Sequence, residues 1–305
     1  MFVVKSCTGT ATRRRGVMIT VALVAAFAVV SPGLGAQKPP TPSAQELLDA
    51  ASDYARDAYP RLANLVATEE YVQERRIEAK ARRVLRSEFL LVQHPTDRRN
   101  WLAYRDVLEV DGKKLENHQA RVQQLFVAPT IENWMLVGDI ASASQQYHLA
   151  GANVSVTNPF VVVALIDRYY RPRLQFKLGK EDKDVGRNVW TLVFQEPEAL
   201  ERVAVNGAQT LRKVEPLLQK DLARGTVWIE VGTGRILKTQ LRLGDGLGAP
   251  TSLTTFRYDE KLEVAVPVEM KTTWTDGTGS RSAVSGTAKY TAFRQFGIQT
   301  SVETP

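Results

Sequence analysis

The second half of the sequence consists of short segments in which apolar and polar residues alternate, joined by tight turns. Segments 226–231 and 235–243 flank Gly232-Thr233-Gly234, and segments 189–195, 253–258, 266–274 and 284–296 alternate in the same way. Alternation with a period of two places the apolar side chains on one face, and short connections join neighbouring strands antiparallel. This half of the chain therefore predicts an antiparallel sheet whose apolar face must be covered by other elements.

The first half supplies candidates for that cover. Ser43 is followed three residues later by Glu46, which is a capping box, and an apolar stripe with helical spacing then continues to Pro60. Further strands are expected at 65–77, 84–92 and 100–110, followed by the Asp111-Gly112 turn.

The sequence predicts that the middle of the chain, 113–180, is irregular and partly helical. A helix is expected at 160–170, after Asn158-Pro159. The predicted class is α+β. We expect one long, curved antiparallel sheet, an incomplete barrel, with helices packed in its concave face.

Residues 1–36 have the features of a secretory signal peptide. Three arginines, Arg13 to Arg15, precede an apolar run at 17–30, and the segment ends with the small residue Ala36. The run is shorter than the roughly 20 residues that a membrane-spanning helix needs, which favours cleavage near Ala36 over retention as an anchor. We therefore predict a periplasmic or secreted protein without a transmembrane segment after cleavage. A Pro-rich tether at 37–42 and a single domain at 43–305 would remain.

Removal of this leader changes the chemistry that the sequence offers. The formal net charge of the chain is +7, and because residues 1–36 contain four basic and no acidic residues, the remainder carries +3. Such a small charge does not favour a nucleic-acid partner. The single cysteine, Cys7, leaves with the leader, which excludes thiolate catalysis and cysteine metal ligands in the mature chain.

Four strand motifs in the second half resemble a known superfamily. They are Gly225-Thr226-Val227-Trp228-Ile229-Glu230, Thr233-Gly234-Arg235-Ile236-Leu237-Lys238-Thr239, Phe256-Arg257-Tyr258-Asp259 and Val266-Pro267-Val268-Glu269-Met270. Over about residues 185–296 the chain resembles the periplasmic lipoprotein-carrier (LolA-like) superfamily, and more narrowly the uncharacterised secreted bacterial proteins of that fold. The resemblance implies a curved, incomplete antiparallel barrel around an apolar cavity that can hold acyl chains. The middle segment 113–180 departs from the carriers, so cavity shape and ligand do not carry over.

Aromatic residues on the C-terminal strands are the first candidate site. They would line a pocket for an acyl chain or another apolar ligand, since ligand cavities are mostly apolar and aromatic. The alternative is that they form an ordinary filled core, as strand aromatics usually do. The set comprises Trp190, Phe194, Trp228, Trp274 and Tyr290.

A basic cluster around the first expected hairpin is the second candidate. It would dock on an anionic membrane surface or on an acidic protein partner. The alternative is a solvated hairpin of mixed charge, because Glu74, Glu78 and Glu88 lie among the arginines. The cluster comprises Arg75, Arg76, Arg82, Arg83 and Arg86, with Lys80 between them.

Signatures of catalysis are weak throughout. The histidines His94, His118 and His148 are far apart, and no Gly-x-Ser-x-Gly elbow or phosphate-binding loop occurs, so we expect no metal site, no cofactor and no enzyme. Glu69 and Glu70 would point to opposite faces of a strand and could not act as a pair.

Three classes of function follow from these features, and they are given in order of the support that the sequence offers. The first is a secreted or periplasmic binding protein that holds a lipid, an acyl chain or another apolar ligand in the curved sheet. The second is an envelope interaction or sensing protein that binds another protein through the same fold, by the basic hairpin or an exposed strand edge. The third is an enzyme, for which a site assembled from distant strands would be invisible in one sequence.

Overall fold

The computed structural model describes residues 40–63, 65–75, 80–93, 101–115, 143–149, 156–198, 200–205, 208–213, 217, 222–246, 248–275 and 283–295. The chain forms a compact unit from Pro42 onward. The predicted leader 1–36, Arg76 and the greater part of 113–155 lie outside the described residues. Within the described part of the chain, no helix is both long and apolar enough to cross a membrane.

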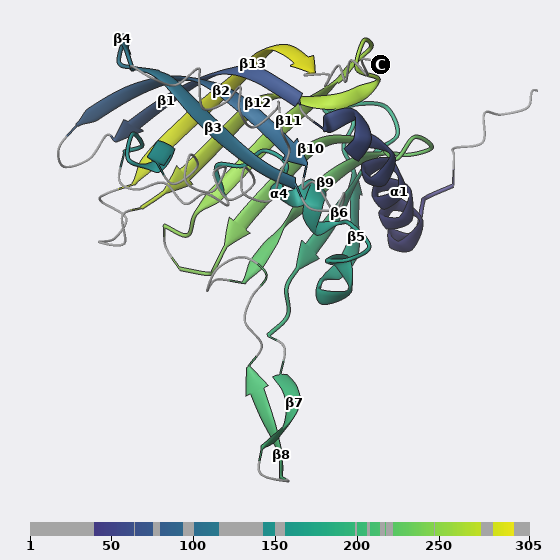
Figure 1. Cartoon of the computed structure of the whole chain (residues 1–305). Coiled ribbons are helices and arrows are strands. Elements are labelled where there is room, and N and C mark those ends of the chain that lie inside the picture. The colour runs from purple at the N-terminus through teal and green to yellow at the C-terminus, as the bar shows by residue number, and fades with distance from the viewer. Residues whose placement is uncertain are drawn as a thin grey trace, which may run out of the picture. The chain divides into compact units, whose positions relative to one another are not determined.

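The main sheet has eleven strands, and each is antiparallel to its neighbours (Figure 1). It is open, with β4 at one edge and β5 at the other. In spatial order the strands are β4 (Lys113–Lys114), β3 (Trp101–Val110), β2 (Ala81–Gln93), β1 (Leu65–Arg75), β13 (Val284–Gln295), β12 (Val264–Trp274), β11 (Thr251–Asp259), β10 (Ile236–Leu243), β9 (Ala223–Glu230), β6 (Val189–Gln195) and β5 (Gln175–Glu181). A separate two-stranded sheet joins β7 (Leu200–Val205) to β8 (Ala208–Lys213).

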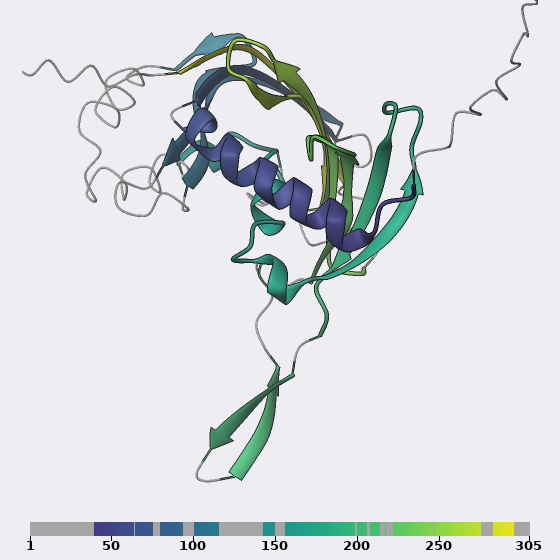
Figure 2. The same ribbon diagram turned by 90° about the vertical axis from the view of Figure 1, so that its right-hand side faces the viewer.

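The sheet curves around helix α1 (Ala44–Leu62), which lies across the concave side (Figure 2). The predicted capping box is present: the backbone N–H of Glu46 donates to Ser43 Oγ at 3.1 Å, and the Ser43 N–H donates to Glu46 Oε2 at 2.7 Å. The helix continues through Pro60 and ends at Leu62. The predicted α+β fold, a curved open sheet with helices on its concave face, is thus confirmed.

The stripe that α1 buries is made of small side chains in its middle. Leucines lie near both ends, whereas Ala51, Ser52 and Ala55 face the core between them. The helix packs against β5, β6 and β12. Tyr54 and Tyr59, which are partly buried, also pack against the core, and the Ala265 N–H on β12 donates to the Tyr54 hydroxyl at 2.8 Å.

Helix α4 (Val161–Leu165) is much shorter than the helix expected at 160–170. The Asp167 side chain accepts a hydrogen bond from the Tyr169 N–H at 2.9 Å, a local contact that competes with helical hydrogen bonding. The chain then turns through the short 3₁₀ helix η1 (Arg171–Arg173) into β5. Helix α4 packs against β10, and its buried residues Val162, Val163 and Leu165 join the core.

Candidate functional site

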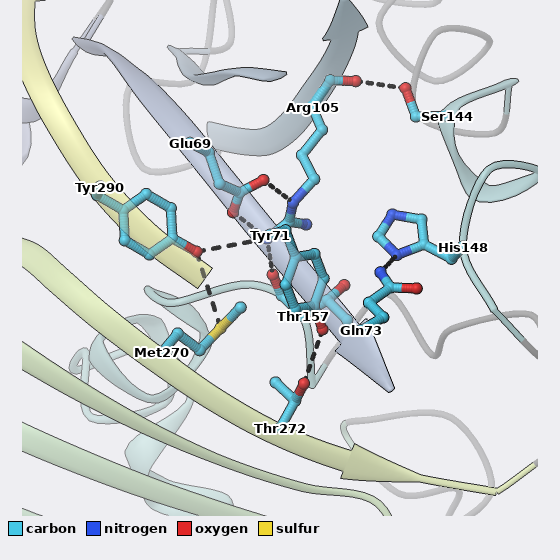
Figure 3. Close-up of polar contacts among 10 residues, drawn as sticks. All are labelled: Glu69, Tyr71, Gln73, Arg105, Ser144, His148, Thr157, Met270, Thr272 and Tyr290. Atoms are coloured by element: carbon cyan, nitrogen blue, oxygen red, sulfur yellow. Dashed lines mark hydrogen bonds and ion pairs between the residues drawn. The ribbon is translucent and has the colours of Figure 1, made fainter. Parts of the chain in front are cut away.

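A network of polar side chains lies buried on the concave face, over β1, β3, β12 and β13 (Figure 3). On β1, alternation turns Glu69, Tyr71 and Gln73 inward, whereas Glu70 is exposed. The prediction that Glu69 and Glu70 point to opposite faces is confirmed. The other members are Arg105, Ser144, His148, Thr157, Met270, Thr272 and Tyr290.

Arg105 and Glu69 form a buried, bidentate ion pair at the centre of this network. Arg105 Nε lies 2.5 Å from Glu69 Oε2, Nη2 lies 2.8 Å from Oε1, and the two residues are 7% and 0% exposed. Burial alone would lower the pKa of Arg105, but the Glu69 carboxylate and neighbouring tyrosines outweigh it and raise the pKa. The guanidinium therefore stays charged, and the pair carries no net charge.

Further contacts surround the guanidinium of Arg105. Nη2 also donates to the backbone carbonyl oxygen of Thr157 at 2.5 Å and, at 3.4 Å, to the hydroxyl of Tyr290. The guanidinium carbon lies 5.4 Å from the Tyr71 ring centroid and 5.5 Å from that of Phe89. Burial, followed by Glu69, raises the pKa of Tyr290, so its hydroxyl is neutral. The charge pair is thus enclosed by aromatic rings.

Segment 143–149 is held to this end of the concave face by side chains of the sheet. Gln73 Oε1 accepts from the Leu149 N–H at 2.8 Å, so the Gln73 amide nitrogen is the donor to His148 Nδ1 at 2.5 Å. Trp274 Nε1 donates to the Leu149 carbonyl oxygen at 3.1 Å, and Ser144 Oγ donates to the carbonyl oxygen of Arg105. An imidazole that accepts at Nδ1 is neutral.

The pH dependence of stability should report on His148. Burial, with the charges of Arg105 and Arg83 adding to it, lowers the pKa of His148 from 6.5 to about 3. Below pH 6.5 the unfolded chain binds a proton that the folded chain excludes, so stability present above 6.5 is lost as the pH falls toward 3. We expect a loss of about 2 kcal/mol at about pH 5, measured by urea unfolding. His148→Gln should remove this part of the loss, and identical pH profiles of the two proteins would contradict it.

The structure brings four of the five predicted aromatic residues onto the concave face, in separate places. Trp274 lies beside Tyr71 with ring centroids 6.4 Å apart, Tyr290 contacts Phe89 at 5.4 Å, and Phe194 lies 6.4 Å from Phe176. Trp190 is half-buried and packs against the same core. Trp228 lies on the other face, where its Nε1 donates to Asp182 Oδ2 at 2.8 Å and Lys238 lies 4.9 Å from its ring.

Phe160 is a concave-face residue that the sequence analysis did not single out as a site. Its ring lies 6.3 Å from that of Phe89 on β2 and 5.8 Å from that of Phe256 on β11, so it bridges strands on two sides of the concave face. It is 1% exposed. The segment before α4 thus inserts an aromatic ring into the space that the sheet encloses.

The basic cluster is divided between the two faces of the β1–β2 hairpin. Arg82 and Arg86 alternate with the buried Leu85 and are exposed, whereas Arg83 shares the side of Leu85 and donates to the Tyr147 carbonyl oxygen at 2.8 Å. Arg75 is half-buried at the end of β1, and Arg76 lies outside the described residues. Glu74 lies 4.0 Å from Arg82, Asp111 lies 3.6 Å from Arg83, and Glu70 is the register partner of Arg86.

A surface groove of about 360 Å³ lies away from the polar network described above. It runs along α1 beside the β9–β10 and β11–β12 turns and is lined by Ala50, Asp53, Tyr54, Asp57, Ala58, Arg61, Gly232, Thr233 and Glu263. Arg61 donates to the Glu263 carbonyl oxygen at 2.8 Å, which ties the helix to one turn. Within the described parts of the chain, no three His, Cys, Asp or Glu side chains gather as a metal site would require.

Comparison with known proteins finds similarity only among solved structures. No family profile and no curated protein sequence matches the chain. A LolA superfamily protein from Nitrosomonas europaea is 11% identical, with 87% of this chain and 99% of that chain covered and a TM-score of 0.39. A putative outer membrane lipoprotein-sorting protein domain from Vibrio parahaemolyticus is 13% identical, with 85% and 95% covered and a TM-score of 0.36.

A third solved structure is a DUF1329 family protein from Desulfovibrio piger. It is 10% identical, with 87% of this chain and 96% of that chain covered and a TM-score of 0.33. The architecture itself rests on the strand order and register described above.

Proposed function

We propose that this chain is a periplasmic or secreted, non-enzymatic binding protein that holds a lipid, an acyl chain or another apolar ligand against the concave face of its sheet. The observation that carries the proposal is the thin cover over that face. Over the middle turns of α1, the fully buried residues are the small Ala51, Ser52 and Ala55, and α4 is five residues long. Location outside the cytoplasm is supported by the leader-like sequence of residues 1–36.

Burial of the apolar ligand is sufficient to drive binding at such a site. Each methylene removed from water contributes about 0.8 kcal/mol, so a sixteen-carbon chain gains on the order of 10 kcal/mol against the cost of displacing part of the cover. The sheet edges do not meet, which leaves a side from which a chain could enter. The rings of Phe89 and Phe256, which lie on either side of Phe160, supply the apolar surface that the chain would contact once Phe160 is displaced.

Fluorescence quenching by a brominated acyl chain tests this proposal. The chain should be a dibrominated stearoyl group, presented both as the free acid and as the glycerol monoester, so that the head group does not decide the outcome. Bromine quenches tryptophans that it touches, so we expect Trp190→Phe and Trp274→Phe each to reduce the quenchable fraction of the fluorescence. Trp228→Phe is the matched control, since Trp228 lies on the opposite face.

Saturable quenching in the wild type that these concave-face variants reduce would support the proposal. Absence of quenching by both forms of the lipid, or an effect confined to Trp228→Phe, would overturn it. In that case the second candidate, an envelope protein that binds another protein, would be favoured. The observation that supports this second candidate is the groove along α1, whose rim carries Asp53, Asp57 and Glu263.

A further inference from the structure

The Arg105–Glu69 pair is chemically unlike the apolar surface around it. Replacing a buried ion pair with apolar residues of similar size is often neutral or stabilising, so stability alone gives little reason for placing one here. The pair lies on the face that we propose as the binding surface, next to the rings of Tyr71 and Phe89. A role in recognising the polar end of a ligand would account for its position.

The charge of Arg105 is already neutralised. Glu69 takes two of its N–H groups, at 2.5 and 2.8 Å, and both side chains are buried. A carboxylate or phosphate brought to this point would add a second negative charge and leave a net charge in an apolar surrounding, which is costly. The pair therefore disfavours an anionic head group.

Besides the Glu69 carboxylate, the Arg105 guanidinium has an uncharged acceptor. Arg105 Nη2 donates to the backbone carbonyl oxygen of Thr157 at 2.5 Å, and Thr157 lies in the segment that covers the concave face. A backbone carbonyl is an uncharged acyl oxygen. The same group is present in the ester or amide that ends an acyl chain, so Thr157 shows which ligand atom fits opposite the guanidinium.

A second polar group, the Ser87 hydroxyl, lies on the adjacent strand. It is buried, the residue is 1% exposed, and its oxygen makes no hydrogen bond with any of the residues that the structure describes. Ser87 is the register partner of Glu69 on the adjacent strand β2, and it shares the inward side of β2 with Phe89. A buried hydroxyl without a partner costs free energy, which a ligand oxygen would recover.

From these contacts we infer that the concave site recognises an uncharged acyl carbonyl, the ester or amide at the head of an acyl chain. The ligand carbonyl takes the place of the Thr157 carbonyl at Arg105 Nη2, and the Ser87 hydroxyl hydrogen-bonds the neighbouring ligand oxygen. Glu69 holds the guanidinium in place and keeps the site neutral. This inference rests on the proposed function and adds to it the class of head group.

The test compares two lipids that share one chain and differ in head-group charge. The affinities of 1-monopalmitoylglycerol and palmitate should be measured by tryptophan fluorescence below their aggregation limits. For the wild type we expect the ester to bind at least about tenfold more tightly, equivalent to 1.4 kcal/mol. In Glu69→Gln the positive charge of Arg105 is no longer neutralised, so the preference should shift toward palmitate by about tenfold or more. Glu70→Gln, a neighbour on the exposed face, should behave as the wild type.

Other results separate this inference from the proposed function. Equal binding of both lipids, unchanged in Glu69→Gln, would overturn the head-group inference and leave the acyl-binding proposal standing. Binding of neither lipid would remove both. If Glu69→Gln does not fold, Ser87→Ala decides: a roughly three- to tenfold weaker ester affinity with unchanged palmitate affinity supports the inference, and no change contradicts it.

Discussion

Replacing Arg105 with leucine is expected to lower the free energy of unfolding by about 3–5 kcal/mol. The variant leaves the Glu69 carboxylate in a position where the wild-type residue is 0% exposed, without the cation that neutralises it. It also removes the donor to the Thr157 carbonyl oxygen. Urea unfolding followed by far-UV circular dichroism measures the loss.

A double variant and a surface control make this result specific. Leucine at both positions 69 and 105 removes the pair together, so much of the stability should return, and the double-mutant cycle gives the coupling energy. Arg82→Leu is the control, because Arg82 is exposed and its ion pair with Glu74 spans 4.0 Å; it should cost less than about 1 kcal/mol. A double variant as unstable as Arg105→Leu would show that the buried charge is not the cause.

The local features of the fold could be predicted because each is encoded by neighbouring residues. The Ser43 capping box, the Gly232-Thr233-Gly234 turn and the alternation along β10 all depend on contacts within a few positions, and the structure contains them. The edge strand β5 was missed because Gln175–Glu181 offers only Phe176 and Leu178 as apolar alternation, with lysines and a glycine between and after them. An edge strand has a single neighbour in the sheet and needs fewer apolar residues.

The face that Trp228 occupies could not be predicted from its own segment. Val227, Trp228 and Ile229 are all apolar, so their order does not say which of them point inward. The register decides this: Val227 pairs with the buried Leu192, which places Trp228 beside Thr191 on the other face. Such pairing joins positions that are distant in sequence, and one sequence does not record it.

The central ion pair illustrates the same limit. Glu69 and Arg105 lie 36 positions apart, on β1 and β3, and β2 separates their strands. A signal was nevertheless present, since each stands at an inward position of a strand whose inward neighbours, such as Ala67 and Val107, are apolar. A charged residue on the apolar side of a strand pattern needs a partner across the sheet, although the sequence does not identify that partner.

Phe160→Ala is expected to lower the stability of the protein and to strengthen its binding of an acyl ligand. The ring is 1% exposed and lies between Phe89 and Phe256, so its removal should cost about 3–5 kcal/mol through lost burial and the space left behind. Urea unfolding measures this cost. Tyr169→Ala is the matched control, because that ring is 69% exposed and should change stability by less than about 0.5 kcal/mol.

The effect of Phe160→Ala on ligand binding follows from the space that the Phe160 ring occupies. If acyl chains bind on the concave face, Phe160 fills part of the space that a chain needs, and displacing it is part of the cost of binding. Its truncation should therefore strengthen the binding of 1-monopalmitoylglycerol under conditions where the variant is folded, and the bound lipid should recover part of the lost stability. Weaker binding by the folded variant would mean that Phe160 contacts the ligand instead of occupying its place, and unchanged binding would place the ligand away from Phe89 and Phe256.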